Sequence, residues 1–198
     1  MSQPPSDTAA GTATQPAQYS TQERGALLLL AHRAIEARLA GIELKVIAPS
    51  AHLEEKRGAF TTLHLHGRLR GCVGYVFPIY PLYRTVAETA VAAALNDIRF
   101  PPVTCEEAPL LKIEISVLSP VQPILPEQIE IGRHGLVVSY ATRRGLLLPQ
   151  VPVEHGWDRL TFLEQTCLKS GSPPDAWQRG AVIEAFTAEI FAEKLIAD

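Results

Sequence analysis

The chain has 198 residues, a length typical of one domain or of two closely joined lobes. Hydrophobic residues make up 46%, charged residues make up 20%, and the net charge is -3, which argues against a protein held to nucleic acid mainly through phosphates. The sequence contains no apolar run long enough to cross a membrane, no secretory signal pattern, and only three scattered cysteines. We therefore expect a soluble, cytoplasmic protein that binds neither nucleic acid nor membranes.

The N-terminal segment differs in composition from the rest of the chain. Residues 1–18 contain no Leu, Ile, Val, Phe, Tyr or Trp, so they cannot bury enough apolar surface to offset the entropy lost on ordering. We predict a disordered tail over 1–18 and a single folded domain over 19–198. Ser20 and Glu23 have the spacing of a capping box, which predicts a helix that ends near Gly41.

The remaining elements follow from hydrophobic periodicity and from breaker residues. The pattern predicts, in chain order, a hairpin over 59–75, a helix over 81–95, strands over 113–117, 135–140 and 145–148, a helix over 158–169, and an element over 181–191. The last element fits a helix or a strand, and its alternation favours one strand. This order is not a regular β-α-β alternation, so it predicts an α+β fold with antiparallel or mixed sheets. Because the chain has neither a G-x-G-x-x-G motif nor a phosphate-binding loop, we predict no nucleotide cofactor.

The most unusual stretch is `LRGCVG`, residues 69–74, in which Gly71 and Gly74 bracket Cys72. Glycine weakens a strand and usually marks a bulge or a close backbone approach. Side chains two residues apart in a strand share a face, so Arg70 is expected beside Cys72. A guanidinium close to a thiol favours the thiolate form.

The register of the hairpin decides which other residues share that face. A three-residue loop over 66–68 pairs Leu65 with Leu69, whereas a two-residue turn over 67–68 pairs leucines with polar residues. The hydrophobic pattern therefore predicts the three-residue loop. The resulting polar face pairs His64 with Arg70 and Thr62 with Cys72.

This face resembles a nucleophile site, because it combines a thiol, a guanidinium and a nearby imidazole. The alternative is that Cys72 is only a small hydrophobic residue, the role that we assign to Cys105 and Cys167. His64 and His66 are spaced as two metal ligands on one strand face. The predicted loop separates them and the sequence offers no third ligand, so we predict no metal.

Two further stretches carry a resemblance to a known family. They are `NDIRFPPV`, residues 96–103, followed by `IEISVLSP`, residues 113–120, and `GLLLPQVPVEHGWDRLTFLEQTCLKSGSPPDAW`, residues 145–177. Together with `LRGCVG`, they resemble the AMMECR domain family, also called AmmeMemoRadiSam system protein A, over residues 20–193. The family more often reads L-R-G-C-I-G, so Val73 is a mild departure. The resemblance implies two unequal lobes with sheets in each, a few packed helices, and a cleft between the lobes that exposes the cysteine.

The candidate site residues come from the polar face and from the motifs of the resemblance. Catalytic candidates are Cys72, Arg70, His64, Asp97 and Glu114. Binding candidates are Gly71, Gly74, Asn96, Arg99, Ser116, Gln150, Glu154 and His155. Each also has a structural interpretation: Asp97 and Arg99 as a surface ion pair, Glu114 as a solvated strand residue, Glu154 as a helix-start acid, and His155 as a loop residue.

Two functions remain open at this point. The first is an enzyme that acts on a small molecule or a peptide, with Cys72 as nucleophile or redox thiol. Arg70 would activate it, and His64, Asp97 or Glu114 would supply acid or base. The second is a non-catalytic module that binds a peptide, a metabolite or a modified residue. The resemblance implies that such a module works with Memo-like and radical S-adenosylmethionine proteins.

Overall fold

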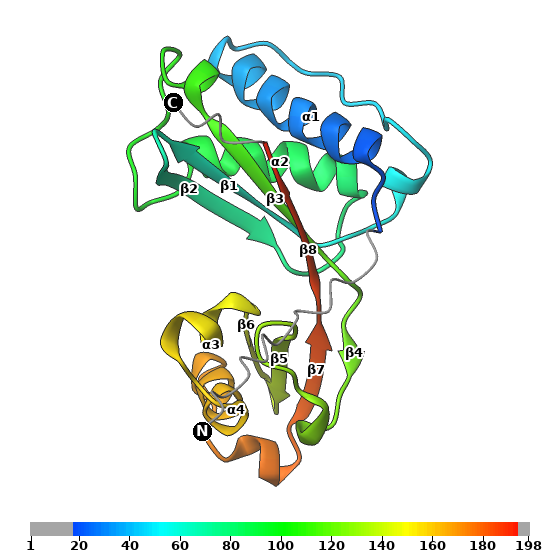
Figure 1. Cartoon of the computed structure of the whole chain (residues 1–198), viewed down its shortest axis with the longest axis vertical. Coiled ribbons are helices and arrows are strands. Elements are labelled where there is room, and N and C mark those ends of the chain that lie inside the picture. The colour runs from blue at the N-terminus through cyan, green and yellow to red at the C-terminus, as the bar shows by residue number, and fades with distance from the viewer. Residues whose placement is uncertain (1–17, 194–198) are drawn as a thin grey trace, which may run out of the picture.

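A computed structural model describes residues 18–193, which form two lobes with one four-stranded antiparallel sheet each (Figure 1). The sheet of the first lobe has the order β2-β1-β3-β8, and the sheet of the second has the order β4-β7-β5-β6. The first lobe contains α1 (Thr21–Leu39), β1 (Ala59–Leu65), β2 (Arg68–Tyr75), α2 (Leu82–Leu95), β3 (Lys112–Leu118) and β8 (Ala188–Ala192). The second contains β4 (Gln122–Pro123), β5 (Gly135–Tyr140), β6 (Arg143–Leu147), α3 (Gln150–His155), α4 (Arg159–Lys169) and β7 (Val182–Phe186). The predicted α+β class with two lobes is confirmed.

The predicted tail lies outside the described residues, except for Gln18. The backbone N–H of Gln18 donates to Glu189 Oε2 at 2.6 Å, and that of Tyr19 donates to Glu189 Oε1 at 3.3 Å. Glu189 belongs to the edge strand β8, so its carboxylate ties the start of the described chain to the first sheet.

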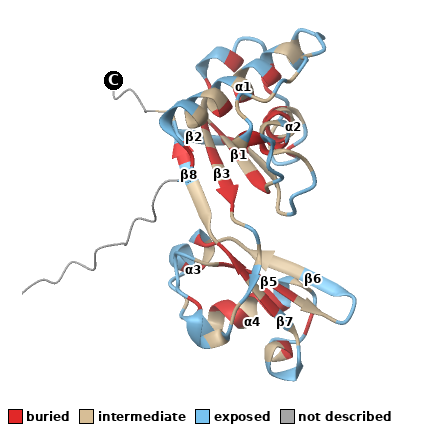
Figure 2. Cartoon of the chain, turned by 90° about the vertical axis from the view of Figure 1, so that its right-hand side faces the viewer, coloured by how far each residue is buried: buried red, intermediate tan, exposed pale blue. Residues whose placement is uncertain are grey.

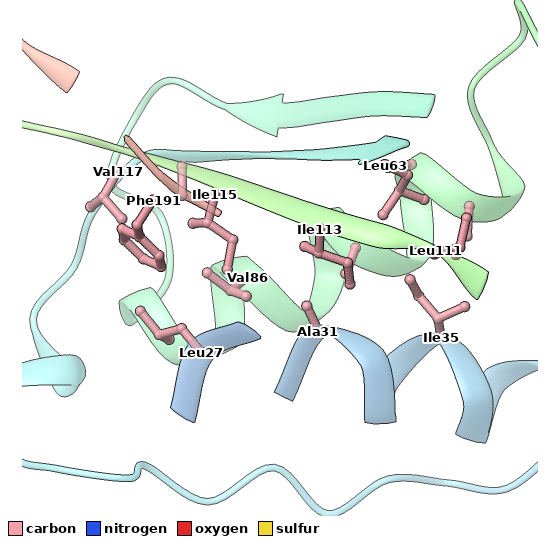
Figure 3. Packing of buried hydrophobic residues seen from close by; sticks show 14 of the residues in the cluster. Leu27, Ala31, Ile35, Leu63, Val86, Leu111, Ile113, Ile115, Val117 and Phe191 are labelled. Atoms are coloured by element: carbon pink, nitrogen blue, oxygen red, sulfur yellow. The ribbon is translucent and has the colours of Figure 1, made fainter. Parts of the chain in front are cut away.

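The core of the first lobe lies between α1, α2 and one face of the sheet. The predicted capping box is present, because Ser20 Oγ accepts from the backbone N–H of Glu23 and the Glu23 carboxylate accepts from that of Ser20. It starts α1 so that Leu27, Ala31 and Ile35, at helical spacing, point at the sheet (Figure 3). The side chains that meet them are Val86 of α2 and Ile113, Ile115 and Val117 of β3.

The second lobe is built around β5, whose first four residues are all buried (Figure 2). Leu136 packs with Phe162 and Leu163 of α4, while Val137 faces the opposite way, toward the first lobe. Because both faces of β5 are covered, it reads as a continuous apolar run instead of an alternating one.

An apolar cluster joins the two lobes. Leu118 at the end of β3 packs with Val137 and Phe186 of the second lobe, and Phe60 lies against the same cluster. Nearby, the Arg144 guanidinium lies 4.3 Å from the centroid of the Phe77 ring. The lobes are therefore in contact at this point, and the predicted cleft between them stays a prediction.

The single strand predicted over 181–191 is wrong. The segment forms two strands, β7 in the second sheet and β8 in the first, separated at Thr187. Thr187 donates its backbone N–H to Ser119 Oγ and accepts from the backbone N–H of Ser119. The two segments that cross between the lobes are thus hydrogen-bonded to each other. The alternation of apolar and polar residues continues past Thr187 because each half of the segment forms a strand in its own sheet.

The predicted hairpin loop is also wrong, although part of the predicted register is right. Leu65 pairs with Arg68, so the turn has two residues, His66 with φ 49° and Gly67 with φ 72°. Two consecutive positive φ values are those of a type I′ turn, which suits the twist of a hairpin. The register then shifts by one residue next to Arg70, as in a β-bulge, and this shift restores the predicted pairing of Thr62 with Cys72.

Candidate functional site

Cys72 lies on the face of the first sheet that points away from the helices. Its pairing partner Thr62 sits between Thr61 and Leu63, which are fully buried on the helix side. The Thr62 hydroxyl donates to Cys72 Sγ at 3.3 Å. Cys72 is partly exposed, whereas Cys167 is buried and Cys105 is exposed. The Cys72 thiol is therefore reachable from solvent and also accepts a hydrogen bond.

Asp97 and Arg99 close the outer edge of β2 at Cys72. Asp97 Oδ2 accepts the backbone N–H of Cys72 at 2.8 Å, and Arg99 Nη2 donates to the carbonyl of Cys72 at 3.3 Å. β2 is the edge strand of its sheet, so these two backbone groups have no neighbouring strand. At Cys72, the side chains of Asp97 and Arg99 form the hydrogen bonds that a neighbouring strand would otherwise form.

The ion pair between Asp97 and Arg99 joins a buried carboxylate to an exposed guanidinium. Arg99 donates from Nε to Asp97 Oδ1 at 2.9 Å and from Nη2 to Oδ2 at 2.7 Å, a bidentate arrangement. Asp97 is 8% exposed. These bonds from Arg99, together with the Cys72 N–H, hold the pKa of Asp97 well below its usual range.

The guanidinium at Cys72 belongs to Arg99, which donates to the Cys72 carbonyl. The pKa of Arg99 is raised, mainly by its hydrogen bonds to Asp97. Thr62 thus bonds the Cys72 sulfur and Arg99 bonds its backbone, and Asp97 holds Arg99 in position. The sequence pattern had placed a different arginine there.

Arg70 does not share the face of Cys72 as predicted, because the β-bulge turns it toward another part of the fold. Its Nε and Nη2 donate to both carboxylate oxygens of Glu107, at 3.1 and 2.9 Å. Its Nη1 and Nη2 donate to the carbonyls of Pro101 and Pro102. The Arg70 side chain is 11% exposed, so it braces the chain after α2 and has little access to a ligand.

The two glycines around Cys72 have steric reasons. A Cβ at Gly71 would lie 2.1 Å from the carbonyl oxygen of Ala93 in α2. A Cβ at Gly74 would lie 2.3 Å from the Phe60 ring. Close packing of strand on helix and of strand on ring thus explains why both positions are glycine.

The other predicted site residues are spread over both lobes. The predicted pairing of His64 with Arg70 is wrong, because His64 pairs with Leu69 of β2 and with Lys112 of β3, and no hydrogen bond within residues 18–193 links it to Cys72. Glu114 pairs with Thr62, so it belongs to the open face, as does Ser116 two residues on. Asn96 is the exposed C-cap of α2. Gln150, Glu154 and His155 are exposed on α3 in the second lobe, where the His155 ring stacks on Trp157 at 4.6 Å between centroids.

Glu107, the partner of Arg70, was missed at the sequence level. Its signal is the spacing T-x-x-E from Thr104 to Glu107, because the two residues exchange backbone-to-side-chain hydrogen bonds as in a capping box. The hydrogen bonds from Arg70 and Thr104 lower the pKa of Glu107.

Two further properties concern residues 18–193 only. No group of three or more His, Cys, Asp or Glu side chains in this part of the chain is arranged to hold a metal ion. None of its helices combines the length and the apolar character needed to cross a bilayer.

Comparison with known proteins identifies the family. The family model described as AMMECR1 matches residues 28–191. The chain belongs to the AMMECR1 family. Protein MJ0810 of Methanocaldococcus jannaschii is 45% identical over 184 residues, covering 87% of this chain and 92% of that protein. Protein TK0174 of Thermococcus kodakarensis is 44% identical over 184 residues, covering 85% and 89%. The crystal structure of the uncharacterized protein PH0010 from Pyrococcus horikoshii superposes with a TM-score of 0.76 at 43% identity, covering 87% of this chain and 92% of that one.

Proposed function

We propose that this AMMECR1-family protein is an enzyme that uses Cys72 as a nucleophile or redox thiol on a small molecule or a peptide. The observation that supports this most strongly is the surroundings of Cys72, a partly exposed thiol whose Sγ accepts a hydrogen bond from Thr62 and whose backbone carbonyl accepts one from the Arg99 guanidinium. A hydroxyl donor and a fixed positive charge both favour a thiolate over a thiol.

Asp97 is the positioning residue of this arrangement. Its carboxylate holds the Arg99 guanidinium through two hydrogen bonds and also accepts the N–H of Cys72. One side chain thus fixes both the cation and the backbone of the nucleophile, so neither has to reorganise when a substrate arrives. Glu114, on the same open face, is the carboxylate available for proton transfer.

The alternative is a binding module without catalysis. Its support is that, within residues 18–193, Thr62 is the only side chain that forms a hydrogen bond with Cys72 Sγ, and no imidazole or carboxylate does so. In that case Arg99, which is 54% exposed, is the group that binds an anionic part of the ligand, and Cys72 is a small residue beside it. Memo-like and radical S-adenosylmethionine proteins are the proposed partners of either activity.

The two functions differ in what Cys72 does to an electrophile. With p-nitrophenyl acetate, the Cys72 thiolate attacks the carbonyl carbon, a thioester forms, and p-nitrophenolate leaves with the bonding electrons. With hydrogen peroxide and a proton, the thiolate becomes a sulfenic acid and water is released. Mass spectrometry of the native protein locates either product on Cys72, Cys105 or Cys167.

The enzyme proposal expects acetylation and sulfenic acid to appear first at Cys72, with a burst of p-nitrophenolate that Cys72→Ser abolishes. Cys105→Ser is the matched control and leaves the burst unchanged, because Cys105 is exposed and lacks these donors. Modification of Cys72 no faster than that of Cys105 with both reagents overturns the proposal and leaves the binding module.

A further inference from the structure

A cavity lies in the first lobe, away from the open face that carries Cys72. Its volume is about 650 Å³, in the range of sites that hold a ligand. One wall is the outer surface of α2 from Tyr83 to Asn96, and the other is the last part of α1 with the segment that follows it. Four alanines contribute to the lining and leave the space open: Ala34, Ala37, Ala87 and Ala92.

The segment after α1 is extended. Ser50 Oγ donates to Glu23 in the first turn of α1, so the chain runs back along the whole helix between Ala40 and Ser50 (cyan in Figure 1). That distance is about 24 Å, whereas ten helical residues would span only about 15 Å. Inward and outward positions alternate, with Leu44 and Val46 partly buried and Lys45 and Ile47 exposed. This is the period of a strand.

This extended segment belongs to no sheet. Within residues 18–193, no backbone N–H or C=O of residues 43–49 has a hydrogen-bond partner. An extended chain with free backbone groups is a template for pairing with another strand. Two large apolar side chains on it, Ile42 at 65% and Ile47 at 81%, are also exposed.

The charges of the lining argue against an ionic ligand. Two arginines, Arg38 and Arg84, are balanced by Glu43 and Glu88, and Arg84 is already paired with Glu88 at 2.9 Å. The groove therefore has no excess charge to select an anion or a cation. The alanines of the lining and the free backbone of residues 43–49 are the features left to recognise an occupant.

We propose that this groove binds an extended, uncharged peptide segment of another protein, paired as a strand with residues 43–47. The α2 wall from Tyr83 to Asn96 is about 20 Å long, which accommodates about six extended residues. Alternate side chains of the peptide point at the alanines, so they are large and apolar. The chain's own residues 1–17 contain no large aliphatic or aromatic residue beyond Met1 and do not fit this requirement.

The probe is a set of four fluorescent, end-capped hexapeptides in which Ser alternates with Leu, Ile, Phe or Tyr. Their binding to the full chain is measured by fluorescence anisotropy up to about 1 mM, the weak end of specific binding. Ala37→Phe fills the groove from α1, and Ala40→Phe, just after that helix and outside the lining, is the matched control. Hydrogen exchange reports whether the amides of residues 43–49 become protected.

We expect at least one peptide to bind, Ala37→Phe to weaken that binding at least tenfold, Ala40→Phe to leave it unchanged, and exchange to slow within residues 43–49. Failure of all four peptides to bind the wild-type chain overturns the proposal. So does equal binding to Ala37→Phe, or protection confined to residues outside 43–49. A dimer of the wild-type chain that Ala37→Phe dissociates also overturns it, because the occupant would then be a second copy.

Discussion

Replacement of Asp97 by Ala tests whether the edge of β2 depends on one carboxylate. Four hydrogen bonds end on Asp97: from the Cys72 N–H at 2.8 Å, the Arg99 N–H at 3.2 Å, Arg99 Nε at 2.9 Å and Arg99 Nη2 at 2.7 Å. The Arg99 side chain is 54% exposed and turns to water when its partner is lost, so its bonds add little to stability. The Cys72 N–H loses its acceptor, the carboxylate of Asp97, a residue that is only 8% exposed. Leaving this N–H unpaired lowers the free energy of unfolding by about 2 kcal/mol.

Asp97→Ala is therefore expected to lower the free energy of unfolding by about 2–3 kcal/mol, equivalent to a fall in Tm of about 5–10 °C. Chemical denaturation at neutral pH measures the first quantity, and hydrogen exchange of the Cys72 amide reports the local effect. Asp175→Ala is the control, since Asp175 forms an exposed pair with Arg179, and it should cost no more than about 0.5 kcal/mol.

The same interaction has a defined pH dependence. The folded pKa of Asp97 lies below its unfolded value, so its stabilisation is complete above the unfolded pKa and is lost as the pH falls toward the folded one. The difference in stability between wild type and Asp97→Ala should thus shrink on acidification. A loss of unfolding free energy in Asp97→Ala that equals the loss in Asp175→Ala, or that does not change with pH, would refute the proposed role of Asp97 at the edge of β2.

The remaining predictions concern packing, bracing and acid stability. Gly71→Ala should destabilise the fold by about 2–3 kcal/mol in chemical denaturation, because its Cβ would meet the Ala93 carbonyl at 2.1 Å and neither backbone yields easily. Arg70→Ala should cost about 3 kcal/mol, since it takes the cation from Glu107, which keeps only the Thr104 N–H, and the donors from two carbonyls, and a loss below about 1 kcal/mol would contradict the bracing role. The pKa of Glu23 is lowered to about 2, mainly by the backbone N–H of its N-cap partner, so its contribution is present above about pH 4.5 and fades toward pH 2. Glu23→Gln should flatten that part of the stability profile in acid titration.

Much of the fold follows from local rules that operate within a few residues. The capping box of α1, the alternation of β3 and the Pro81 start of α2 each specify an element without reference to the rest of the chain. The predictions that are wrong depend on contacts between residues far apart in the sequence. Whether residues 181–191 stay in one sheet depends on Ser119, 68 residues away, which exchanges hydrogen bonds with Thr187.

The site was predictable in part. Strand periodicity and hydrophobic matching correctly paired Thr62 with Cys72. These patterns do not predict the bulge at Arg70. A two-residue turn followed by a bulge gives Thr62 and Cys72 the same pairing as a three-residue loop without a bulge. The cation at Cys72 is instead Arg99, 27 residues along the chain, which donates to the Cys72 carbonyl where the end of α2 packs against the edge of β2.

The most direct test of an activated Cys72 is its iodoacetamide alkylation rate relative to that of Cys105, measured on native protein by mass spectrometry. Cys105 is the more exposed thiol and serves as an internal reference. We predict that Cys72 reacts faster than Cys105 at neutral pH, that Arg99→Gln removes this advantage, and that Arg99→Lys restores part of it. If Cys72 instead reacts more slowly than Cys105 and Arg99→Gln does not change the ratio, the account of Cys72 as an activated thiol is contradicted.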